Sequence, residues 1–123
     1  MRKLVLLAGL GAAIGSSLRY TISLSLPVTL GTSFPWPTLS VNLLGSFLIG
    51  LISTNTNLVN DEAKRAFYVA GVLGGFTTFS ALAVEAVDMV DRPVLFITYL
   101  VSTFAGGVLL VQLGVMLKIK SAK

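Results

Sequence analysis

The sequence predicts an all-α membrane protein with four transmembrane helices. Of its 123 residues, 54% are apolar and 11% are charged, and the mean hydropathy is +0.90. An ordinary soluble domain is about 25% charged, because a chain of this length must cover a large surface with polar side chains. The composition therefore excludes a soluble enzyme domain, a disordered chain and a nucleic-acid-binding module, so no nucleic-acid partner is expected.

The charged residues leave uncharged runs at 4–18, 20–60, 66–84 and 93–117. Prolines and a glycine interrupt the second run near residues 27–37. A transmembrane helix needs about 20 apolar residues. These limits predict helices at about 4–25, 37–55, 64–88 and 93–117. Four such helices use about 80 residues, so we expect residues 1–123 to form one transmembrane domain surrounded by lipid.

The first helix has an alternative interpretation. Arg2 and Lys3 precede an apolar stretch that ends near Gly15, Ser16 and Ser17, a pattern that resembles a secretory signal peptide. Three more segments of membrane length follow, which favours a first helix that stays in the protein.

The basic residues predict the orientation. Four helices place both termini on one side, with seven of the nine basic residues; Arg19 and Arg92 lie on the other side. Cytoplasmic segments are enriched in Lys and Arg. We therefore expect a multi-pass protein of the cell (inner or plasma) membrane with cytoplasmic termini.

The chain contains no Cys and no His. This excludes disulfides, thiolate metal sites and catalytic pairs that use Cys or His. We expect a protein that is not an enzyme.

The third helix carries the least helical segment. Gly74 and Gly75 are adjacent and are followed closely by Thr77 and Thr78, and two consecutive glycines weaken a helix. Broken helices occur at membrane depth where the freed backbone lines a cavity or binds an ion. We expect helix 3 to be broken at mid-membrane, where carbonyls could hold a cation or N–H groups an anion.

Polar side chains recur at helical spacing. Three rows follow this spacing: Thr38, Asn42 and Ser46; Tyr99, Thr103 and Gly107; and Thr78, Leu82 and Glu85. A further row of Thr98, Ser102 and Gly106 leaves the choice of face on the last helix open. Such groups either hydrogen-bond between helices or line a narrow, hydrated path.

Two charged residues and one aromatic pair have two interpretations each. Glu85 is an acid inside the membrane, which indicates function, or an interfacial one. Arg19 either snorkels to the interface or anchors a broken segment. Phe76 and Phe79 pack in the interior, or their electropositive ring edges meet an anion.

Four thin helices enclose little interior. A pore would therefore need a second subunit, most simply in an antiparallel or two-fold dimer.

Three strings in the sequence are more specific than helical spacing. The string from Gly74 to Ser80, Gly-Gly-Phe-Thr-Thr-Phe-Ser, with Glu85 five residues later, is similar to the third-helix signature of the Fluc (CrcB) family of fluoride channels. Gly11, Gly15 and Arg19-Tyr20 look like the first-helix motif, and residues 38–45 like the second.

The resemblance implies a fluoride-selective passive channel that exports cytoplasmic fluoride and so relieves its toxicity. Two oppositely oriented subunits would hold one structural sodium ion, which is not transported, through the backbone carbonyls of Gly74 and Thr77. Arg19 would anchor the fold. The fluoride path would comprise Thr38, Asn42, Phe79, Ser80, Glu85, Tyr99 and Thr103.

Two positions depart from the family pattern. Leu82 stands where a second Phe is usual, and Gly107 where a Ser is common. With the strong charge bias, these departures leave two partners open: a copy of this chain, or an oppositely oriented paralogue.

Two other functions fit the size and composition. A small proton-coupled multidrug transporter is one, although its carboxylate belongs in the first helix and none is found there. A non-conducting partner subunit of a larger complex is the other.

Overall fold

The computed structural model describes residues 1–26 and 34–121, and these contain helices and no strand. Four helical stretches are long and apolar enough to cross a membrane: α1 (Arg2–Ser25), α2 (Trp36–Ser53), the stretch Glu62–Asp88, and α7 (Pro93–Ser121). This confirms the all-helical class and the four membrane-length helices. Most of the loop predicted near residues 27–37 lies outside the described residues.

Helix α2 begins among prolines and ends at hydroxyl groups. Pro35 precedes the helix and Pro37 occupies its first turn, where the missing N–H removes no helical hydrogen bond. The Ser53 hydroxyl donates to the Gly50 carbonyl (2.8 Å), and the Thr54 hydroxyl to the Leu51 carbonyl (3.3 Å). The helix ends two residues before the predicted 55. A short helix that the sequence did not predict, α3 (Thr56–Val59), follows.

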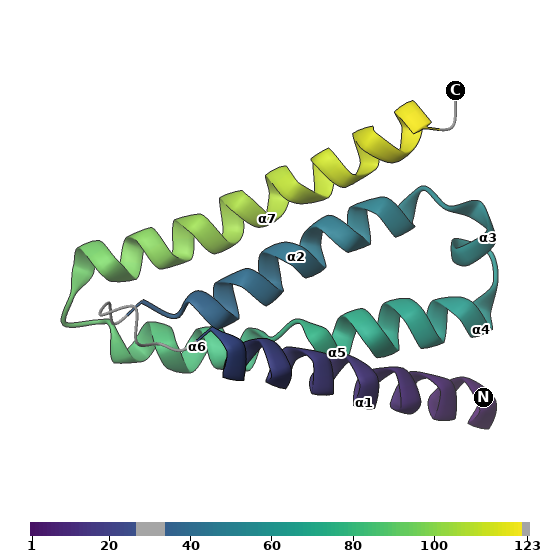
Figure 1. The fold of residues 1–123 in the computed structure, drawn as a ribbon, viewed down its shortest axis with the longest axis horizontal. Coiled ribbons are helices and arrows are strands. Elements are labelled where there is room, and N and C mark those ends of the chain that lie inside the picture. The colour runs from purple at the N-terminus through teal and green to yellow at the C-terminus, as the bar shows by residue number, and fades with distance from the viewer. Residues whose placement is uncertain (27–33, 122–123) are drawn as a thin grey trace.

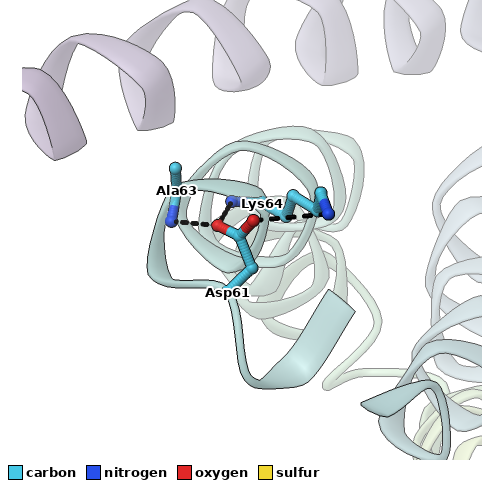
Figure 2. Close-up of polar contacts among 3 residues, drawn as sticks. All are labelled: Asp61, Ala63 and Lys64. Atoms are coloured by element: carbon cyan, nitrogen blue, oxygen red, sulfur yellow. Dashed lines mark hydrogen bonds and ion pairs between the residues drawn. The ribbon is translucent and has the colours of Figure 1, made fainter. Parts of the chain in front are cut away.

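Asp61 caps the next helix, α4 (Glu62–Lys64). One carboxylate oxygen accepts from the N–H groups of Ala63 (3.0 Å) and Lys64 (3.1 Å), and the other lies 3.3 Å from Lys64 Nζ (Figure 2). The backbone hydrogen bond from Lys64, and then its side chain, hold the pKa of Asp61 below its ordinary value of 3.8. This cap therefore stabilises the fold above that pH and is lost as the pH falls through the lowered pKa.

The third membrane-length stretch is not one regular α-helix. After α4 it continues as η1 (Arg65–Leu73), a π-helix, and then as α5 (Gly74–Phe76). Thr77 and Thr78 have extended backbone, with ψ of 159° and 123°, and α6 (Phe79–Asp88) follows. The helical bonding is thus interrupted at the two threonines, while Gly74 and Gly75 are themselves helical.

The helices pack mainly as two pairs. Helix α1 lies along η1 and α5, and α2 lies along α7 (Figure 1). Both termini and the α3–α4 connection lie at one end of the molecule, and the α6–α7 connection lies at the other (Figure 1). The basic residues that the sequence predicts on the side of the termini belong to helix ends at this shared end, apart from Lys123, which lies outside the described residues. They are Arg2, Lys3, Lys64, Arg65, Lys118 and Lys120.

Glycines set the close approach of α1 to the third stretch. A Cβ atom on Gly15 would overlap the backbone of Val72 and Phe76, and one on Gly75 would lie 2.5 Å from the Ala12 carbonyl oxygen. Small residues at such crossings permit the van der Waals contact that drives helix association in lipid. Gly75 therefore serves close packing rather than the interruption itself.

Gly15→Ala is expected to destabilise the protein, because the added methyl group meets backbone that cannot rotate away. Overpacking of this kind costs roughly 1–3 kcal/mol, which thermal unfolding of the purified protein in detergent would report. Gly9→Ala is the matched control, since a Cβ there has nothing within 4 Å. Equal unfolding temperatures for the two variants would contradict this account of the crossing.

Candidate functional site

A cavity of about 730 Å³ lies between α2, the interrupted third stretch and α7. Polar side chains of Asn42, Ser46, Thr77, Thr78, Thr103 and Gln112 line it, together with glycines and apolar residues. Among the described residues that line the cavity none is charged. Its polar groups are therefore hydroxyls and amides, which can both donate and accept hydrogen bonds.

Asn42 binds the interruption from the neighbouring helix. Its Nδ2 donates to the Thr78 carbonyl (2.9 Å), and its Oδ1 accepts from the Thr78 N–H (2.8 Å). One side chain on α2 thus satisfies both backbone groups of an extended residue that helical bonding has left unpaired. Because an amide nitrogen carries two hydrogens, Asn42 keeps a second donor for a ligand.

The interruption frees carbonyl groups, among them those of Gly74 and Thr77. In a continuous α-helix the Thr78 N–H would bond to Gly74 O and the Ala81 N–H to Thr77 O. Here the Thr78 N–H donates to Asn42 instead, and the Ala81 N–H donates to the Thr78 hydroxyl (3.2 Å). The carbonyls of Gly74 and Thr77 therefore lose their helical donors, and carbonyl oxygens of this kind are ligands for hard cations.

Arg19 and Ser80 support the same segment from outside the cavity. Arg19 Nε, on α1, donates to the Gly75 carbonyl at 3.2 Å. The hydroxyls of Ser80 and Thr78 lie 3.2 Å apart. Together with Asn42, these contacts hold the interrupted segment from three helices.

Glu85 belongs to a second polar cluster, in which three helices meet. Its Oε1 accepts from the Thr38 hydroxyl (2.7 Å), and its Oε2 accepts from the Tyr99 hydroxyl (2.6 Å). Thr38 and Tyr99 are buried, and Tyr99 packs in an apolar cluster with Phe34, Leu39, Leu82 and Met89. Both carboxylate oxygens thus have a donor, which offsets part of the cost of burying a charge.

Comparison with known proteins identifies the family. The family model described as CrcB-like protein, Camphor Resistance (CrcB), matches residues 6–115. The chain belongs to the CrcB family. A relative from Xanthomonas euvesicatoria is 43% identical over 114 residues, or 89% of this chain and 86% of the relative. One from Roseiflexus is 40% identical over 114 residues (89% and 92%), and one from Thermus thermophilus is 49% identical over 88 residues (70% of each). All three are named fluoride-specific ion channel FluC.

Membership of the CrcB family, with four membrane-length helices, makes this chain a multi-pass membrane protein. It also places the chain in a family of ion channels, which is not an enzyme class.

The residues predicted for the CrcB site fall into three groups. Asn42, Gly74, Thr77, Phe79 and Thr103 line the cavity, and Phe79 is 72% exposed on the single chain. Thr38, Glu85 and Tyr99 form the second cluster and do not line the cavity, while Arg19 and Ser80 contact the interrupted segment without lining the cavity. The cavity lining includes Thr103 and Gly107 but not Thr98, Ser102 or Gly106, so the row that begins with Tyr99 lies on the face of α7 toward the cavity.

Gln112 lines the cavity and was not among the predicted site residues. It lies one turn beyond Val108 and two beyond Phe104 on α7, a row beside that of Thr103 and Gly107. The sequence signal was a lone amide in a long uncharged run, which helical spacing alone did not connect to the other polar rows.

Proposed function

We propose that this chain is a subunit of a fluoride-selective passive anion channel that exports cytoplasmic fluoride and so relieves its toxicity. The observation that carries the proposal is a cavity lined by hydroxyls and amides at an interrupted helix, in a chain whose relatives are named fluoride-specific ion channels. We place the interruption at mid-membrane and the termini in the cytoplasm.

The chemistry of the cavity suits a small anion. Fluoride is strongly hydrated, so its water must be replaced by other hydrogen-bond donors as it leaves bulk solvent. The free hydrogen of the Asn42 amide provides such a donor, and the ring edge of Phe79 is electropositive. Cavity hydroxyls that now donate to helix carbonyls can rotate to provide further donors. A narrow path would reject chloride, which is larger.

The second cluster fits a role at one end of this route. Thr38 and Tyr99 already donate to Glu85, so its carboxylate repels an incoming anion less than a free one would. We propose that Thr103 inside the cavity also lines the fluoride path, and that Thr38, Ser80, Glu85 and Tyr99 continue it beyond the cavity.

Sodium fits the freed carbonyls of Gly74 and Thr77. Two carbonyls are too few for a hard cation, which takes about six or more oxygen ligands, so a second subunit would supply more. Among the described residues no group of three acidic, His or Cys side chains could hold a metal instead. When bound, a fixed cation would offset the cost of negative charge in a region of low dielectric.

The second subunit would be oppositely oriented, and either a copy of this chain or a paralogue. In either case the membrane potential drives export. An inside-negative potential of 100 mV favours outward movement of a monovalent anion by about 2.3 kcal/mol, which is roughly a fiftyfold ratio at about 1.4 kcal/mol per decade.

Fluoride efflux from liposomes tests the proposal. The purified chain is reconstituted into liposomes loaded with potassium fluoride, valinomycin is added, and fluoride is followed with an electrode; chloride-loaded liposomes are the control. Rapid fluoride loss with chloride retained would support a channel that this chain forms alone. Fluoride loss only after co-expression with a paralogue would indicate a heterodimer, and no loss in either preparation would overturn the proposal.

A further inference from the structure

Ser46 lies on α2 one turn after Asn42 and lines the cavity. Its hydroxyl oxygen lies 3.3 Å from the position that a Cβ atom on Gly107 would occupy. Gly107 is the third member of the row that begins with Tyr99 and Thr103 on α7. The hydroxyl of Ser46, on the facing helix, therefore lies next to the place where this row lacks a side chain.

The Ser46 hydroxyl is also free. Ser and Thr in helices commonly bond back to a carbonyl three or four residues earlier, as Ser16, Ser17, Thr21, Ser23 and Ser25 all do in α1. Thr77 and Thr103, which also line the cavity, do the same, and Thr78 caps α6.

Among the cavity hydroxyls of the described residues, Ser46 alone has no hydrogen-bond partner. An unpaired hydroxyl within an apolar span is unfavourable unless a ligand or water pairs with it. Its position therefore indicates a group that meets what occupies the cavity.

We propose that Ser46 is a direct fluoride ligand, which supplies from α2 the hydroxyl that Gly107 lacks on α7. The proposal rests on the function proposed above. Ser46 lies about 6 Å along the helix axis from Asn42, at a rise of about 1.5 Å per residue. The anion can pass from the Asn42 amide to the Ser46 hydroxyl in one step, and one donor replaces another as it moves.

Three variants test this assignment in whichever liposome preparation conducts fluoride as the wild type. Ser46→Ala is expected to lower fluoride efflux about tenfold, the effect of losing one hydrogen bond to a charged group. Ser102→Ala is the matched control, because Ser102 is a serine of α7 that does not line the cavity, and it should conduct like the wild type.

The double variant S46A/G107S is the decisive measurement. With the Ser46 oxygen removed, a Cβ at position 107 has only the Cβ of residue 46 nearby, at 4.0 Å, which is ordinary contact. A serine at 107 then returns a hydroxyl to the same space, and efflux should recover to within about twofold of the wild type, since the number of donors is restored.

The outcomes separate the two proposals. Wild-type efflux that Ser46→Ala leaves unchanged would overturn the role of Ser46 and leave the channel function intact. A loss that G107S does not restore, with normal elution on size exclusion, would also overturn it, because the hydroxyl would then not be what matters. A wild type that conducts no fluoride in any preparation would overturn the channel function, and this assignment with it.

Discussion

Asn42→Asp is expected to abolish fluoride efflux while the protein still assembles. The substitution removes the Nδ2 donor that now binds the Thr78 carbonyl at 2.9 Å and places an anionic oxygen against that carbonyl. It also adds a negative charge to a cavity whose described lining carries none. Two like charges 4 Å apart repel by about 4 kcal/mol at an effective dielectric constant of about 20.

A barrier raised by this amount slows passage roughly a thousandfold, at about 1.4 kcal/mol per decade. Liposome efflux measures the loss, and size-exclusion chromatography checks assembly. Asn57→Asp makes the same chemical change on an exposed residue of α3 and should conduct normally. Full efflux from Asn42→Asp would remove Asn42 from the fluoride path.

Phe79→Ile is expected to reduce fluoride efflux to background. Phe79 lines the cavity and is 72% exposed within the chain, so its ring is available to a ligand or to a second subunit. Isoleucine is also large and apolar, but it lacks the electropositive edge of an aromatic ring. The variant therefore removes a favourable contact with an anion while leaving an apolar side chain in place.

Phe67→Ile is the matched control. Phe67 lies outside the cavity and packs edge-on against Tyr68, with ring centroids 5.0 Å apart. Both variants are measured by the same fluoride efflux, with folded protein checked by thermal unfolding. Loss of efflux in both would indicate a general effect on packing, and retention in Phe79→Ile would show that the ring is not a fluoride contact.

The four membrane-length helices follow from the sequence alone. Charges and prolines divide the chain into apolar runs of membrane length, and in lipid such a run satisfies its backbone groups by forming a helix. The helix ends were less well determined, because local hydrogen bonds decide them. Helix α2 ends at Ser53, earlier than predicted, and the π-helix of η1 has no signal in a pattern of apolar residues.

The sequence predicted the candidate site only in part. Helical spacing places Thr38 and Asn42 on one face of α2 but does not say what that face meets. The structure brings Asn42 to Thr78, 36 residues away, and Thr38 to Glu85, 47 residues away. The contact with Thr78 places Asn42 at the cavity, and the contact with Glu85 places Thr38 in the cluster with Tyr99. Thr38 and Asn42 are nevertheless only one helical turn apart.

The sequence by itself determined the class of the protein and its membrane-length helices, because hydropathy is a local property. Only the tertiary structure decided the pairing of α1 with η1 and α5 and of α2 with α7. It also decided that the interruption falls at Thr77 and Thr78, where Asn42 satisfies the freed backbone, while Gly75 packs against Ala12. Such contacts depend on how closely two helices approach, and periodicity along one helix does not contain that distance.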